Sequence, residues 1–110
     1  MSLDVLLLDP TTPIPEVRYG ATVPQALAPM ARAAGLYEVL WTPEQVAIHV
    51  AGDMRQFLRK GWATLRLEEG RCRALAPADG WGTYEQLVQF TRELLMACQR
   101  TPEALVRVIW

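Results

Sequence analysis

The 110-residue sequence is poor in the side chains that carry out most catalytic and metal-binding chemistry. It has one histidine, His49, one serine, Ser2, and two cysteines, Cys72 and Cys98. A Ser-His-Asp triad or a zinc site needs more such groups at suitable spacing, so neither is predicted. No stretch reaches the ~18 apolar residues of a membrane-spanning helix. A net charge of −1 gives no overall attraction to nucleic acid or anionic lipid. We therefore expect no membrane association, metal, cofactor or catalytic residue.

The expected compartment is the cytoplasm. No basic residues precede the apolar start Leu3–Leu8, so this segment does not fit a signal peptide. Without export, the cysteines are expected to stay reduced. Cys72 is the one candidate nucleophile, because its neighbours Arg71 and Arg73 would favour the thiolate and lower the pKa of the thiol. No motif pairs it with His49, and a structural role is the favoured interpretation.

Three segments have the patterns of β-strands. The apolar content of 51% is sufficient for one packed domain over residues 1–110. Leu3–Leu8 is apolar on both faces, which favours a central strand. The prolines of Asp9–Pro15 predict a loop, after which Val17–Ala21 would turn back as the second strand of a hairpin. Ala104–Trp110 alternates apolar and polar side chains and predicts a final strand.

Three Thr-x-x-Gln segments between these strands predict helix starts. In this pattern the threonine hydroxyl accepts a hydrogen bond from the amide three residues on, and the glutamine reaches back. The segments begin at Thr22, Thr42 and Thr83. The first helix is expected to be kinked or shortened at Pro29, and the second is expected to run to about residue 67.

Residues 65–75 fit two descriptions. They alternate like a hairpin around Gly70, but the apolar stripe of the preceding helix continues into Leu65. A helix end followed by a loop is favoured, and the hairpin is the alternative. The sequence as a whole predicts an α+β domain, in which three main helices pack on a small sheet formed by the N- and C-terminal strands.

Two segments carry a resemblance to a known family. Gly35–Glu44 fits the pattern G-[IL]-Y-x-x-L-W-x-P-E, and Gly80–Glu85 fits most of the pattern N-G-W-G-x-Y-E. Through them the chain resembles, over nearly its whole length, a family of small uncharacterised bacterial and phage proteins. The resemblance implies no activity. The family tends to have Asn-Ile-Thr-His-Asn-Leu where this chain has Thr22–Leu27, so a polar site built on that run would be altered here.

Aromatic residues supply a candidate ligand site. Trp81 and Tyr84 flank the start of the last expected helix, whose positive N-terminal end could hold an anionic group. Tyr37 and Trp41 share a helical spacing and could complete an aromatic pocket. The alternative is structural: Tyr37 and Trp41 pack in the core, and Trp81 packs on Leu87 as a hydrophobic staple.

Residues 53–73 form a basic segment, with six cations against three anions. The cations are Arg55, Arg59, Lys60, Arg66, Arg71 and Arg73. With Trp62 as a stacking group, this segment could contact nucleic-acid phosphates. The alternative is a solvated helix face, because no nucleic-acid-binding signature accompanies the charges.

The leading functional prediction is a non-catalytic protein-interaction module. Four tryptophans are more than so small a core easily buries, and exposed aromatic residues often mark interfaces. The partner would be another protein or a second copy of the chain in a homodimer. The alternatives are a nucleic-acid-associated accessory protein acting through residues 53–73 and a small-ligand binder near Trp81 and Tyr84. His49 is expected to pair with Asp53 one helical turn later rather than to act as a base.

Overall fold

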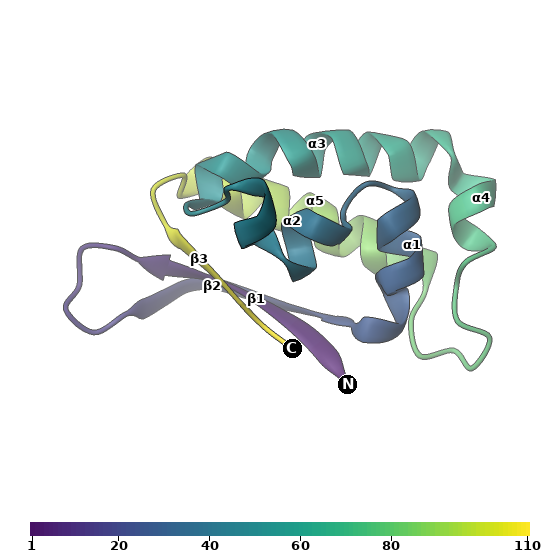
Figure 1. Cartoon of the computed structure of the whole chain (residues 1–110), viewed down its shortest axis with the longest axis horizontal. Helices are drawn as coiled ribbons and strands as arrows, with labels where there is room; N and C mark the ends of the chain where they lie inside the picture. The colour runs from purple at the N-terminus through teal and green to yellow at the C-terminus, as the bar shows by residue number, and fades with distance from the viewer.

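A three-stranded antiparallel sheet forms one layer of the protein, and the helices cover one of its faces (Figure 1). The computed structural model describes all residues, 1–110. The strands are β1 (Ser2–Asp9), β2 (Glu16–Pro24) and β3 (Leu105–Ile109), in the spatial order β2-β1-β3. The α+β class and the sheet of N- and C-terminal strands are confirmed, and β2 completes the hairpin expected from the sequence.

The centre of the sheet is β1, as its two-sided apolar pattern predicts. Leu3, Val5 and Leu7 are fully buried beneath the helices. Their neighbours on the same face include Val23, which pairs with Leu3, and Val108, which pairs with Val5. Cross-strand apolar pairs of this kind stabilise a sheet against the helical layer.

Two helices of 17 residues, α3 (Ala51–Leu67) and α5 (Tyr84–Arg100), form most of the helical layer and pack on each other. Shorter elements complete the layer. They are η1 (Gln25–Leu27), α1 (Ala28–Ala33), α2 (Tyr37–Trp41), η2 (Pro43–Val46) and α4 (Glu69–Arg73). None of these helices has both the length and the apolar character needed to cross a membrane.

One close contact fixes the approach of α2 to α3. A Cβ atom at Gly61 of α3 would lie 2.2 Å from Cδ2 of Leu36, the residue just before α2. Leu36 is fully buried, so its side chain fills the space that the glycine leaves. The glycine is required for this packing, although glycine in the interior of a helix lowers the stability of the helix.

The expected helix start at Thr22 is wrong. Strand β2 continues to Pro24, and the Thr22 hydroxyl donates to Asp4 Oδ1 across the sheet at 2.6 Å. Pairing with the central strand therefore overrides the local capping pattern. The helix itself begins at Ala28, so Pro29 lies in its first turn, where no helical hydrogen bond is lost and no kink follows.

The expected helix start at Thr42 is also wrong. Only the short 3₁₀ turn η2 follows Thr42, whose hydroxyl makes no capping bond. Ala47 then takes a left-handed conformation with φ 58°, and α3 begins at Ala51. The start of α3 is capped by Asp53, whose Oδ2 accepts from the backbone amide of Val50 at 3.2 Å.

The third capping box is confirmed, and most of residues 65–75, the segment that fitted two descriptions, is helical. The Thr83 hydroxyl accepts from the Gln86 amide at 3.1 Å, and Gln86 Oε1 accepts from the Thr83 amide at 2.8 Å. Residues 65–75 contain the end of α3 and the short helix α4, not a hairpin. The favoured loop is replaced in part by a helical turn, because α4 buries Cys72 in the core.

Candidate functional site

The two edges of the sheet differ in how they are covered. Along β3, the Val106 amide donates to the carbonyl of His49 at 3.1 Å. Beyond the strand, Trp110 Nε1 donates to the carbonyl of Trp41 at 2.9 Å. No other strand pairs with β2 on its outer side, and its hydrogen bonds to β1 account for only half of its backbone groups. The edge at β3 is therefore bonded near its start and borders a hollow of about 470 Å³ lined by Pro43, His49 and Val108, whereas the outer edge of β2 has no backbone bond beyond those to β1.

The register shows which groups of β2 face outward. The Gln25 amide donates to the Met1 carbonyl, and the pairing continues through Leu3 with Val23. Hydrogen-bonded pairs alternate along an antiparallel ladder, so the intervening residues Gly20 and Thr22 direct their amides and carbonyls away from β1. These are strong donors and acceptors that a further strand could use.

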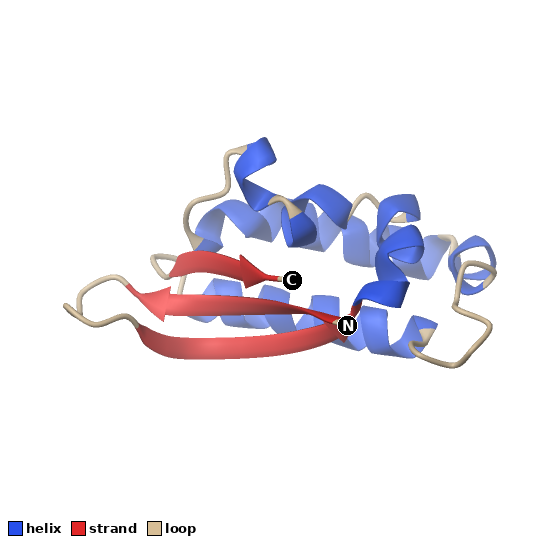
Figure 2. Cartoon of the chain, turned by 60° about the horizontal axis from the view of Figure 1, so that its bottom comes forward, coloured by secondary structure: helices blue, strands red, loops and turns tan.

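Helix α5 runs along β2 (Figure 2), and a groove lies between the two elements. A hollow of about 400 Å³ lies between residues 19–24 of β2 and α5. A second hollow, of about 330 Å³, continues it, because both are lined by Tyr19 and Glu93. The helix contributes side chains at alternating steps of three and four, which place them on one face: Gln86, Gln89, Glu93, Met96 and Arg100.

Trp81 lies at the far end of this groove. It lines a third hollow, of about 400 Å³, which shares Pro24 with the first. The ring is 73% exposed, so the expected staple on the fully buried Leu87 is wrong. A turn holds the residue in place, with the Trp81 amide donating to Asp79 Oδ1 at 3.0 Å and Gly80 at φ +79°.

Two charged side chains of the groove, Glu93 and Arg100, have no ion-pair partner within the molecule. Glu93 accepts only a hydrogen bond from Gln89 Nε2 at 3.1 Å. Burial, and then the carboxylate of Glu93, raises the pKa of Tyr19, while Arg100 opposes this shift. The tyrosine is therefore neutral at pH 7, between one free anion and one free cation.

No family model, curated protein or solved structure matches this chain. The family resemblance of Gly35–Glu44 and Gly80–Glu85 stays a prediction. The function of the groove is therefore inferred from the geometry of the chain itself.

The structure separates the four aromatic residues of the predicted ligand site. Only Trp81 lines a surface hollow. Tyr37 and Trp41 stack with their ring centroids 5.3 Å apart, and Trp41 is buried. Tyr84 is also buried, and its hydroxyl donates to the Leu65 carbonyl at 2.6 Å. Tyr84 and Trp41 therefore hold helices together.

The basic segment is partly neutralised by neighbouring carboxylates. Arg73 pairs with Glu69 and Glu85, at 2.6 Å each, and Arg71 pairs with Glu68 at 3.0 Å. Other members contact their own helix: the Arg55 Nε donates to a backbone carbonyl, and Arg66 lies over the Trp62 ring. Only Arg59 and Lys60 have no such contact. The nucleic-acid alternative stays a prediction that these contacts do not favour.

The predicted low pKa of the Cys72 thiol is wrong. Both Cys72 and Cys98 are free and buried, and desolvation raises the pKa of each thiol, that of Cys98 to about 12. Burial outweighs the effect of Arg71 because it penalises the thiolate directly.

The expected side-chain pair of His49 with Asp53 is also wrong. His49 precedes α3, and its backbone amide, not its imidazole, donates to Asp53 Oδ2 at 3.1 Å.

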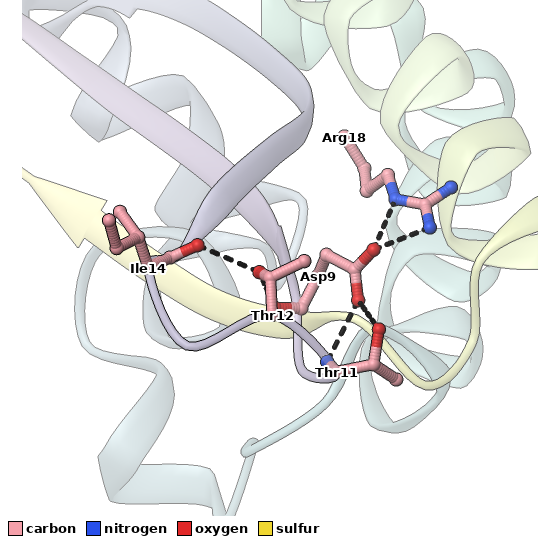
Figure 3. Close-up of polar contacts among 5 residues, drawn as sticks. All are labelled: Asp9, Thr11, Thr12, Ile14 and Arg18. Carbon is pink, nitrogen blue, oxygen red and sulfur yellow. Dashed lines mark hydrogen bonds and ion pairs between the residues drawn. The ribbon is translucent and has the colours of Figure 1, made fainter.

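A polar cluster that the sequence analysis missed closes the β1–β2 hairpin (Figure 3). The nearly buried Asp9 accepts from the Thr11 hydroxyl at 2.6 Å and the Thr11 amide at 2.8 Å, and its other oxygen faces Arg18. Thr12 donates to the Ile14 carbonyl at 2.7 Å within the same loop. The bonds from Thr11 and Arg18 lower the pKa of Asp9 to about 2. All of its partners lie within the hairpin, so its role is structural.

Proposed function

We propose that this protein is a non-catalytic interaction module that takes an extended segment of a partner onto the open edge of β2. The observation that carries the proposal is the open edge of β2 beside a groove with α5, whereas the edge of β3 is already bonded to the chain at Val106 and followed by the Trp110–Trp41 contact. Strand addition to an exposed edge is a common mode of peptide recognition.

The backbone of β2 supplies affinity in this proposal. The outward amides and carbonyls of Gly20 and Thr22 would pair with the added segment as a fourth strand. Each such hydrogen bond contributes only about 1 kcal/mol to the binding free energy in water, so binding needs several of these bonds. Pro24, which has no amide, ends the run, and Pro15 precedes it. The open edge therefore fits a segment shorter than β2.

The groove supplies selectivity. Side chains of an added strand alternate between the two faces of the sheet, so every second one would lie toward α5. There it would meet Glu93 and Met96, and a segment that passes Pro24 would reach Trp81. Exposed tryptophans are frequent anchors of interfaces. The expected partner is a protein, in the cytoplasm, a compartment that the two free cysteines support.

The test compares Thr22→Pro with Thr22→Ala. Both substitutions remove the hydroxyl that bonds Asp4, but only proline removes the outward amide. A random library of extended peptides, about ten residues long, is selected against the full chain at low concentration. Selected peptides are expected to bind Thr22→Pro about fivefold more weakly than Thr22→Ala, the effect of one lost hydrogen bond of about 1 kcal/mol.

A second variant, Trp81→Ala, keeps the test informative if proline perturbs the strand. The ring is exposed, so its removal leaves the fold intact, as circular dichroism would confirm. Peptides that reach Trp81 are expected to lose at least about tenfold in affinity. Peptides that bind all three variants equally, or a selection that yields none together with a chain that does not self-associate, would overturn the proposal.

A further inference from the structure

We infer that the partner on the β2 edge is a second copy of this chain, placed by a two-fold axis so that the two sheets join into one antiparallel sheet of six strands. This inference rests on the proposed function and names the occupant of the same edge. Two observations support it: the backbone of β2 can pair with a second β2, and the charges on α5 are complementary to those of a second α5.

The strand can pair with itself at close range. A two-fold axis always places two copies of one edge strand antiparallel. Gly20 and Thr22, which direct their backbone groups outward, are small, and Gly20 is exposed at the middle of β2. Two copies of Gly20 at the axis can exchange amide and carbonyl bonds, and each Thr22 then lies opposite Arg18 of the other copy, next to the irregularity in the register of β2.

The charges on α5 are self-complementary in the same arrangement. Glu93 and Arg100 are seven residues apart, which is two helical turns, on the face that borders the groove. In an antiparallel copy centred between them, each Glu93 faces the Arg100 of the other chain. Neither residue has an ion-pair partner within its own chain. Met96, 41% exposed, lies near the centre and would pack across the axis.

One axis serves both elements. Tyr19, next to Gly20 in β2, shares a hollow with Glu93, Met96 and Arg100. The centre of the helix pair therefore lies beside Tyr19, one residue from Gly20 at the centre of the strand pair. A lone peptide strand would pair with β2, but only some peptide sequences would also match Met96 and the two charges on α5. The second copy satisfies both.

Sedimentation equilibrium of the full chain over a wide concentration range tests the inference. The unmodified chain and Thr22→Ala are expected to form dimers, and Thr22→Pro is expected to dissociate at least about tenfold more readily, since the axis repeats each lost bond. Glu93→Arg places like charges opposite each other and is expected to weaken the dimer by a similar factor. Adding Arg100→Glu to Glu93→Arg restores opposite charges and is expected to restore the dimer.

The outcomes separate this inference from the proposed function. A chain that stays monomeric at its highest soluble concentration, yet binds selected peptides through the Thr22 amide, would refute the dimer. The proposed peptide-binding function would still hold. A dimer that neither Thr22→Pro nor Glu93→Arg weakens also overturns the inference, because its interface lies elsewhere. A monomer without edge-dependent peptide binding overturns both.

Discussion

Arg18 Nε lies 3.0 Å from Asp9 Oδ2, and this contact joins the end of β1 to the start of β2. The other carboxylate oxygen of Asp9 is held by Thr11, so the hairpin loop is closed by one side chain with both oxygens engaged. The open strand β2 is thus fixed to the central strand at the end opposite to Pro24.

Acid is expected to weaken the hairpin through Asp9. The Thr11 hydroxyl, the Thr11 amide and Arg18 together lower its pKa from 3.8 to about 2. A lowered native pKa adds stability that is complete above the unfolded value and is lost as the pH falls through the native value. The unmodified protein should lose stability relative to Asp9→Asn between about pH 4 and pH 2. Thermal unfolding across this range measures the difference.

The matched control is Glu38→Gln, which removes an exposed carboxylate that makes no side-chain hydrogen bond or ion pair. Its unfolding should keep the acid dependence of the unmodified protein. An Asp9→Asn profile parallel to that of the unmodified protein would show that Asp9 does not carry this effect.

Gly61→Ala is expected to destabilise the fold by about 1–3 kcal/mol, because the new Cβ would lie 2.2 Å from the buried Leu36 side chain. Urea unfolding measures the loss. Gly70→Ala is the control: nothing lies within 4 Å of its Cβ position in α4, so helix propensity alone acts and favours alanine by up to about 1 kcal/mol. Equal effects at the two glycines would contradict the packing argument.

The two helix-entry threonines that share one pattern should respond differently to alanine. Thr83→Ala removes a complete capping box and should cost about 1 kcal/mol. Thr42→Ala removes a buried hydroxyl without a hydrogen-bond partner, so stability should stay unchanged or rise. Chemical denaturation of both variants under one set of conditions checks the contrast. A larger loss at Thr42 than at Thr83 would refute it.

Neither cysteine should react with a thiol reagent in the native protein. Both are buried, and desolvation raises the pKa of Cys72 and raises that of Cys98 to about 12, so almost no thiolate exists at pH 7. Alkylation by iodoacetamide should be slow in buffer and fast in denaturing urea, as mass spectrometry would show. Rapid native labelling of Cys72 would instead support the effect of its arginine neighbours.

Local sequence patterns predicted the segments in which long-range packing favours the same structure as the pattern. The double-sided apolar run of Leu3–Leu8 identified the central strand, and the capping pattern at Thr83 identified the start of α5. The same pattern failed at Thr22, because the threonine pairs across the sheet with Asp4. A capping motif indicates that a segment can start a helix, but pairing with a neighbouring strand can be more stable and then determines the structure.

The candidate site was less predictable because its parts are distant in sequence. The stripe from Gln86 to Arg100 is mostly polar, so by pattern it resembles an ordinary solvated helix face. Its role appears only when β2 lies beside it with an unpaired edge. Trp81 was named from the sequence, but as one member of an aromatic pocket rather than as the isolated end of a groove.

The coverage of β3 by residues near His49 and by Trp110 limits what strand addition can build. A chain with two accessible edges can propagate without end, as fibrils do. Here the edge at β3 is bonded at Val106 and flanked by Pro43 and His49, so a pair formed through the two β2 edges leaves no equally open edge to extend. Edge pairing of this chain therefore favours a closed pair over a polymer.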